Sequence, residues 1–269
     1  MKINDYSKWD IWNPQKNALV SDCDTKSKIS ICTTCMGRTN DLRQTLLQNI
    51  NDNISYGNVE FVVLNYGSKD DMHDYMMSNE IRKFIKSGII RYLRTKSPNF
   101  FSMSHSRNIA FLNSTGDIVT NVDADNYTGF GFAEFINRLN ESCIDKKPFF
   151  SKGKRGLHGR IGVRKSDFIS LGGYDEDLSG YGWDDHSLLL RAMMSDYRLM
   201  WWHGNSSIDF TKRIKTPRNL VGQNMLNKNW KETEKKNQEI TLQKINSGNL
   251  VVNRNKLWGT VDDLEIITS

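Results

Sequence analysis

Asp123 and Asp125 form the acidic pair whose position most clearly suggests a chemical function, because they follow the strand predicted at 117–122. Two carboxylates one residue apart at the end of a strand can both reach one hard divalent cation, which takes oxygen ligands and would bridge a diphosphate. Aspartate pairs are also common in loops and helix caps. The position after a buried strand favours the functional interpretation, since ligands of open α/β sheets bind beyond the carboxyl ends of the strands.

A second acidic pair, Asp184 and Asp185, opens a predicted helix after the glycine- and aromatic-containing stretch 180–183. Acidic residues at a helix N-terminus are stabilised by the helix dipole, so simple capping would explain the pair. The glycines and aromatic residues favour a shaped loop that places a carboxylate against an aromatic-walled cavity. There the carboxylate could act as a general base toward a hydroxyl, and Trp183 could stack on a sugar or a base.

Four further residues, three near the predicted ligand edge and one histidine, are candidates for a binding site. Arg38, Arg107 and Asn108 lie near the predicted ligand edge and could contact phosphate or ribose. For any one of the arginines, a solvated surface charge is the simpler interpretation. His203 is a lone histidine after an aromatic stretch, and such a residue is more often structural than a ligand.

Strand and helix patterns alternate through the first half of the chain. Predicted strands lie at 29–33, 61–64, 89–93 and 117–122, and later at 160–163. Predicted helices begin at 39 or 40 and at 68–71, and span 104–113, 129–143 and 184–194. This alternation predicts a parallel sheet with helices on both faces. The acidic and basic residues described above then follow strands or open helices at the ligand-binding edge.

Composition agrees with a large α/β domain. The chain has 269 residues, of which 38% are hydrophobic and 25% charged, and no apolar run reaches the ~18–20 residues of a membrane span. The N-terminus lacks the apolar run of a signal peptide, so we expect a cytoplasmic protein with reduced cysteines. Cys32 and Cys35 form one C-x-x-C without a second, which favours strand packing over a redox or zinc site. The net charge of +6 suits an anionic substrate such as a nucleotide.

Taken in order, these motifs resemble those of GT-A-fold glycosyltransferases, and the chain is similar to a family-2 enzyme. On the donor side the resemblance is carried by residues 29–34, Arg38, and residues 64–71, 106–108, 115–117 and 123–125. On the acceptor side, residues 171–176 and 181–185 are similar to the β-1,4-galactosyltransferase and chondroitin-synthase group. The resemblance covers roughly residues 28 to 205, and the ordered set is specific although each motif alone is not.

The resemblance implies a fold and a division of the chain. The fold is α/β of the GT-A kind: a Rossmann-like, mixed and mostly parallel sheet flanked by helices, with a helical C-terminal tail. Residues 1–27 would be a leader packed on the domain, and residues 28–216 the catalytic domain. Within that domain, 28–128 would be the nucleotide-sugar half and 129–216 the acceptor half. Residues 217–269 would form the helical or extended tail.

The resemblance also implies a UDP-sugar donor. Polar and aromatic residues would contact that donor, namely Thr33, Thr34, Arg38, Asn65, Ser68, Arg107, Asn108, Asp123 and Trp183. The family commonly has two aspartates where this chain has Asn65 and Tyr66. An asparagine carbonyl can still accept a hydrogen bond from the uracil N3–H.

Metal and catalytic roles follow from the same resemblance. Asp123 would touch ribose and metal, Asp125 would ligate Mn²⁺ or Mg²⁺, and His203 would be a further metal ligand. Asp185 would be the catalytic base, while Asp184 would orient acceptor hydroxyls. One base acting in line, with no covalent sugar intermediate, predicts an inverting transferase.

Two other functions stay open at this point. A sugar nucleotidyltransferase would need a glycine-rich phosphate loop after the first strand, which residues 34–38 do not supply. A non-catalytic carbohydrate- or nucleic-acid-binding module would have no reason to place Asp123, Asp125 and Asp185 in this order.

Two basic clusters flank the acceptor-side motif, at 146–165 and 212–218. A solvated face explains such clusters as well as a binding site does. As a binding site, they would suit an anionic acceptor: a glycan carrying acids, a lipid phosphate at a membrane surface, or a hydroxymethylated base in DNA. The acceptor is therefore predicted to be a glycan or modified DNA.

Overall fold

The computed structural model describes residues 25–141, 148–151, 159–201, 213–214, 224–227 and 229–268. Nearly all of the predicted leader at 1–27 lies outside these residues, as does His203. The predicted division into leader, catalytic domain and tail stays a prediction.

The sheet has eight strands within the described residues, in the spatial order β7-β5-β6-β4-β1-β2-β3-β8. The strands are β1 (Ile29–Cys35), β2 (Val59–Tyr66), β3 (Ile90–Thr95), β4 (Ile118–Asn121), β5 (Pro148–Ser151), β6 (Ile161–Arg164), β7 (Arg198–Trp201) and β8 (Glu265–Ile267). The central strands β4, β1, β2 and β3 are parallel, while β6 and β8 run antiparallel to β4 and β3. The predicted mixed sheet is confirmed, and the central parallel strands end at one edge.

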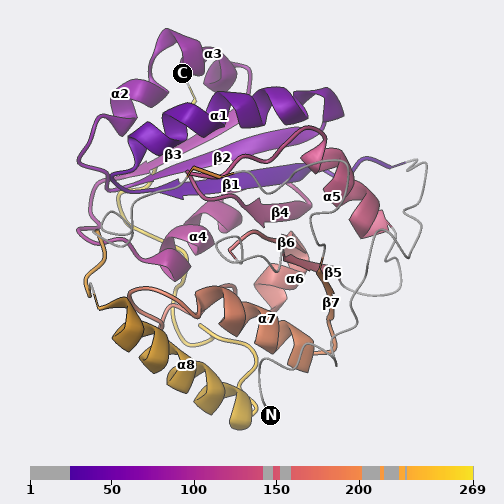
Figure 1. The fold of residues 1–269 in the computed structure, drawn as a ribbon, viewed down its shortest axis with the longest axis vertical. Coiled ribbons are helices and arrows are strands. Elements are labelled where there is room, and N and C mark those ends of the chain that lie inside the picture. The colour runs from indigo at the N-terminus through magenta and orange to yellow at the C-terminus, as the bar shows by residue number, and fades with distance from the viewer. Residues whose placement is uncertain are drawn as a thin grey trace.

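Helices cover both faces of this sheet. They are α1 (Thr39–Asn53), α2 (Met72–Met76), α3 (Asn79–Lys86), α4 (Met103–Leu112), α5 (Phe132–Glu141), α6 (Lys165–Ser170), α7 (Asp184–Met194) and α8 (Trp230–Asn246). Figure 1 shows α1, α2 and α3 on one side of the central strands, with α4, α6, α7 and α8 on the other. The helices predicted at 104–113 and 184–194 correspond to α4 and α7.

Two hydrophobic cores lie on the two faces of the sheet. Side chains alternate along a strand, so Ile31 and Val63 join the core beneath α1, whereas Cys32 and Val62 join the core beneath α4. Cys35 belongs to the first core, so the two cysteines face opposite ways and both are buried. Their prediction as packing residues is confirmed. Burial raises the pKa of the Cys35 thiol to about 12.

The helix predicted to start at 68–71 and to include Met76, Ile81 and Ile85 is two helices in the structure. Helix α2 ends at Met76, and Ser78 adopts an extended conformation before α3 begins. Met76, Ile81 and Ile85 are buried as predicted, whereas Met77, also predicted for the buried stripe, is partly buried. The periodic pattern continues through the break, because both short helices turn an apolar side toward the same core.

The C-terminal segment predicted as a tail contributes to the domain itself. Helix α8 packs against α7, and β8 adds an antiparallel strand beside β3. Asp263 secures this strand because its carboxylate accepts hydrogen bonds from the backbone N–H groups of Lys96 (2.7 Å) and Ser97 (2.9 Å). Within the described ranges, no helix combines the length and the apolar character that a membrane crossing requires.

Candidate active site

The turn after β4 places Asp123 at the carboxyl edge of the sheet. Asn121, the last residue of β4, donates from Nδ2 to Asp123 Oδ1 (2.9 Å) and to the carbonyl of Gly159 (2.9 Å). Helix α1 supports the same turn, since Thr45 Oγ1 donates to the carbonyl of Ala124 (2.7 Å). The turn that carries the D-x-D motif is therefore braced by both the sheet and α1.

Arg107 joins this turn to the start of α7. Its guanidinium is 2% exposed and lies at the centre of three carboxylates. Nη2 donates to Asp123 Oδ1 (3.3 Å), and Nη1 donates to Asp185 Oδ1 (2.7 Å) and to Asp184 Oδ2. The structure thus brings together four of the residues predicted for the site, from β4, α4 and α7. Arg107 binds carboxylates here, and its predicted contact with the donor stays a prediction.

The charges in this cluster do not balance. Three carboxylates share one guanidinium, with Arg160 exerting a further positive field on Asp123. Burial raises the pKa of Asp185 to about 8, and the charges of Asp184 and Asp123 add to the rise, while Arg107 opposes it. At Asp123, burial would raise the pKa, but Arg107 and the hydrogen bond from Asn121 outweigh it and lower the pKa. Asp185 is therefore the carboxylate suited to take up a proton near neutral pH.

Gly159 lies between the acidic groups, and sequence analysis did not identify it. A Cβ at this position would lie 2.8 Å from Arg107 Nη2, 3.2 Å from Asp185 Oδ2 and 3.5 Å from Asp123 Oδ2. Any larger residue would occupy the space that the two aspartate oxygens face. The sequence around it showed only a glycine-containing basic stretch, which carries no signal for this contact.

Asp125 contacts Arg38. Arg38 Nη2 lies 3.3 Å from Asp125 Oδ2, and its Nε donates to Asp41 in the first turn of α1. Among the described residues, no group of three or more His, Cys, Asp or Glu side chains has the geometry to hold a metal ion. His203 lies outside the described residues, so the predicted set of Asp123, Asp125 and His203 stays a prediction.

The polar residues predicted to line the nucleotide site brace the loops after β1 and β2. Thr33 Oγ1 donates to the carbonyl of Val122 (2.8 Å), and Thr34 Oγ1 accepts from Ser106 Oγ (3.4 Å). Thr33 therefore lies beside the turn after β4, and Thr34 lies beside the start of α4.

A second pair of predicted nucleotide-site residues holds the loop after β2. Asn65 Oδ1 accepts from the backbone N–H of Ser68 (3.0 Å), and its Nδ2 donates to the hydroxyl of Tyr92 (3.2 Å). Ser68 Oγ in turn accepts from the N–H of Gly37 (3.0 Å), so the loops after β1 and β2 are joined. The structure brings these residues to the same edge as Asp123, and their contacts with a nucleotide stay predictions.

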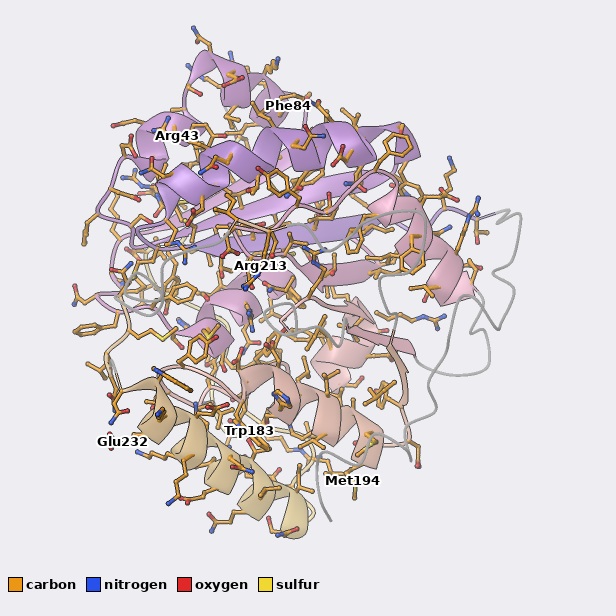
Figure 2. The ribbon with its side chains drawn as sticks, viewed as in Figure 1. Arg43, Phe84, Trp183, Met194, Arg213 and Glu232 are labelled. Atoms are coloured by element: carbon orange, nitrogen blue, oxygen red, sulfur yellow. The ribbon has the colours of Figure 1, made fainter. Side chains whose placement is uncertain are left out.

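Asn108 and Trp183 lie in different settings from the residues at that edge. Asn108 is fully buried, and its amide is bonded to the backbone N–H (2.8 Å) and carbonyl (2.9 Å) of Tyr174 and to Glu176 Oε1 (2.8 Å). It fastens α4 to the segment before α7, and its predicted contact with the donor stays untested. Trp183 caps α7 with a positive φ of 68° and lies beside His186, with ring centroids 5.3 Å apart. Figure 2 shows Trp183 between the ribbons of α7 and α8.

Only part of the two basic clusters falls within the described residues. Arg160 is 1% exposed, donates to the carbonyl of Tyr127 (2.9 Å) and lies over the ring of Phe132. Arg164 donates to Asn140 Oδ1 (2.7 Å), and Lys165 donates to two backbone carbonyls near the end of α4. Arg160 is therefore a buried structural residue, and it belongs neither to a solvated face nor to a binding surface. The 146–147, 152–158, 212 and 215–218 members lie outside the described residues.

Comparisons with known proteins agree with this geometry. Residues 30–137 match the model of "Glycosyl transferase family 2". The fold is similar to the mannosyltransferase PcManGT from Pyrobaculum calidifontis in complex with GDP-Man and Mn²⁺, with a TM-score of 0.56 at 18% identity over 72% of this chain and 57% of that one. It is also similar to S. aureus TarS 1–349 in complex with UDP, with a TM-score of 0.55 at 12% identity over 67% of this chain and 59% of that one. No curated protein sequence matches the chain.

These likenesses establish the fold as GT-A, and the identities are too low to carry a substrate across. The chain spans less than two thirds of the length of either structure.

Proposed function

We propose that this chain, a family-2-like glycosyltransferase with the GT-A fold, transfers a sugar from a UDP-sugar to an acceptor hydroxyl in a metal-dependent, inverting reaction. The observation that carries the proposal is the contact of Arg107 with Asp123 and Asp185. It joins the end of a central parallel strand, where open α/β sheets bind nucleotides, to the start of the helix that carries the base. The guanidinium of Arg107 would thus contact both the donor side and the acceptor side of the site.

Asp185 is the general base in this proposal. Its raised pKa lets the carboxylate accept the proton of the acceptor hydroxyl near neutral pH. As that oxygen forms a bond to the anomeric carbon, the bond from the anomeric carbon to the diphosphate oxygen breaks, and the nucleoside diphosphate leaves with its electron pair. A single displacement of this kind inverts the configuration at the anomeric carbon. Asp184, bonded to the same guanidinium, holds the start of α7 in position.

The residues at the site fit a divalent cation in their chemistry. Hard oxygen donors outnumber positive groups, and the space next to Gly159 faces oxygens of both Asp123 and Asp185. We propose that Asp123 and Asp125 hold the cation, Mn²⁺ or Mg²⁺, as oxygen ligands. When bound, such a cation neutralises charge that builds on the diphosphate leaving group. Mn²⁺ accompanies the nucleotide sugar in the mannosyltransferase structure.

For the acceptor, we propose a glycan hydroxyl. Tyr181 and Trp183 lie in the loop ahead of α7, and aromatic faces of this kind pack against sugar rings. Burial raises the pKa of the Tyr181 hydroxyl, and the negative charges of Asp184, Asp123 and Asp185 add to the rise. The Tyr181 side chain therefore lies near the acidic cluster. Modified DNA has less support, because Arg160 is buried, and Arg164 and Lys165, both partly buried, form hydrogen bonds within the protein.

The proposal is tested by nucleotide release. UDP-glucose, UDP-galactose, UDP-N-acetylglucosamine and GDP-mannose are each incubated with the protein and MnCl₂, and free nucleoside diphosphate is measured over time, with EDTA as the control. Release from at least one UDP-sugar that EDTA abolishes is the expected result. Release from GDP-mannose alone would overturn the UDP assignment, and release from none of the four would contradict the transferase function.

A further inference from the structure

The loop formed by residues 179–182, which leads into α7, is held along its backbone by side chains of α8. Asn237 Nδ2 donates to the carbonyls of Ser179 (3.0 Å) and Gly182 (2.8 Å), and its Oδ1 accepts from the N–H of Ser179 (3.2 Å). One buried carboxamide therefore contacts both ends of the loop. We call residues 179–182 the acceptor loop.

Thr233 holds the middle of the acceptor loop, one helical turn before Asn237. Its Oγ1 accepts from the N–H of Tyr181 (3.2 Å) and lies 3.0 Å from the Tyr181 carbonyl, to which it can donate. The same hydroxyl also lies within hydrogen-bond distance of the Trp230 carbonyl in its own helix (3.1 Å). Together, Thr233 and Asn237 give the short loop the backbone partners that a neighbouring strand would otherwise supply.

Glycines allow the acceptor loop to lie close to α8. Gly180 has a φ of 71°, and a Cβ there would lie 2.6 Å from Thr233 Cγ2. Gly182 has a φ of 90°, and a Cβ there would lie 3.3 Å from Glu234 Cγ. Both positions combine a left-handed backbone with close packing, which only glycine accommodates without strain. Close packing against α8 therefore explains why both positions of the motif are glycine.

The polarity of α8 also singles out this contact. Thr233, Asn237 and Thr241 are spaced four residues apart and are buried, and the other residues of α8 are partly or fully exposed. Apolar residues usually occupy such a face. Two of these three polar side chains bond to the acceptor loop, whereas Thr241 Oγ1 has no hydrogen-bond partner. A buried polar side chain on this face of α8 therefore does not by itself bond to the acceptor loop. The bonds depend on the positions of Thr233 and Asn237 along the helix.

We propose that Thr233 and Asn237 are positioning residues for the transfer reaction. They fix the acceptor loop, and the loop in turn sets the direction of Tyr181 and Trp183 and the start of α7 at Asp185. The role rests on the proposed function of Asp185. Neither residue touches the nucleotide edge of the sheet, so both act on the acceptor side and leave donor binding unchanged.

Replacing Thr233 tests this role, with a matched control on the same helix. Thr233→Val removes the hydroxyl while keeping the shape, Thr233→Ser keeps the hydroxyl, and Thr241→Val removes a buried hydroxyl that bonds to nothing. Asn237→Asp is a second variant, because its carboxylate would face the two loop carbonyls. For each protein we would measure amide exchange at Ser179 and Tyr181, affinity for UDP with MnCl₂, and nucleotide release from the best UDP-sugar.

Thr233→Val is expected to speed amide exchange at Tyr181 and to slow nucleotide release at least about tenfold, since small displacements of catalytic groups are costly. Its affinity for UDP should equal that of the wild type, and Thr233→Ser and Thr241→Val should behave like the wild type. Asn237→Asp should slow release and speed exchange at Ser179. Wild-type release that Thr233→Val leaves intact would overturn the positioning role alone. Absence of release from the wild type would overturn the proposed function and this role with it.

Discussion

Replacing Arg107 by methionine tests the carboxylate cluster directly. The guanidinium is 2% exposed and bonds to Asp123, Asp184 and Asp185. Methionine replaces the apolar stem of the side chain and carries no charge, so the variant leaves the mostly buried Asp184 and Asp185 beside the partly exposed Asp123 without the cation. The change removes the guanidinium, whose Cζ lies over the ring of Tyr174, and keeps most of the apolar stem.

The expected cost follows from what is left behind. Breaking a buried ion pair by removing one partner costs about 3–5 kcal/mol, because the remaining charge stays desolvated. The carboxylates act as one unit, so their contributions do not add. We therefore expect a loss of about 3–5 kcal/mol from a total of roughly 5–15 kcal/mol. Such a loss is readily measured by urea unfolding.

The dependence on pH gives the sharper test. Without Arg107, the pKa of Asp185, which is already raised to about 8, rises further, and Asp123 loses the positive charge that lowers its pKa. An acid with a raised folded pKa destabilises at high pH, and the penalty disappears as the pH falls toward the unfolded value of about 4. The stability difference between the wild type and Arg107→Met should therefore be largest near pH 8 and shrink toward about pH 5.

Arg191→Met is the matched control. Arg191 is equally buried, but its guanidinium donates to the backbone carbonyls of Leu171 (2.7 Å), Gly173 (2.6 Å) and Leu250 (3.3 Å). Its removal leaves neutral groups unsatisfied, so the loss of stability should change little between about pH 5 and pH 8. Equal losses with equal pH dependence in the two variants would refute the reasoning about the carboxylate cluster.

Three further predictions concern the site and its support. Gly159→Ala places a methyl group 2.8 Å from Arg107 Nη2 and 3.2 Å from Asp185 Oδ2, so it should reduce nucleotide release without unfolding the protein; unchanged release contradicts the packing. The raised pKa of Asp185 predicts that wild-type release rises with pH, with an apparent pKa above the ordinary 3.8; a flat profile between about pH 5 and pH 9 contradicts this. Glu60→Gln should lower stability by about 1.5–3 kcal/mol in urea, because all contacts of the buried carboxylate with Ser30 and Thr115 come from donors, and wild-type stability would show that these bonds contribute nothing.

The central strands were predictable because burial on both faces leaves a continuous apolar run. The apolar run at 61–64 lies inside β2, and the strand predicted at 117–122, where Ile118, Val119 and Val122 are apolar, contains β4. Helix α7 was predicted at its observed bounds, since an acidic start precedes a periodic leucine pattern. The outer strands β5, β7 and β8, each of three or four residues, were not predicted.

The contacts that assemble the site were not predictable, because they join residues far apart in the sequence. Arg107 meets Asp184 across 77 positions, and no local pattern distinguishes it from a surface arginine. Arg160 lies in a stretch of basic residues that indicates a solvated face, yet a carbonyl and an aromatic ring from another segment enclose it. Gly159 and Thr233 act through close approach to a neighbour, which composition and periodicity do not record.

The proposed function depends on Asp185 acting as the general base at a site that donor and acceptor share. The most direct measurement compares Asp185→Asn with the wild type in nucleotide release from a UDP-sugar and, in parallel, in affinity for UDP with MnCl₂. Loss of the base should slow release by about 10²–10⁴-fold while leaving UDP affinity unchanged. Release by Asp185→Asn at the wild-type rate, with the same affinity for UDP, would contradict the account.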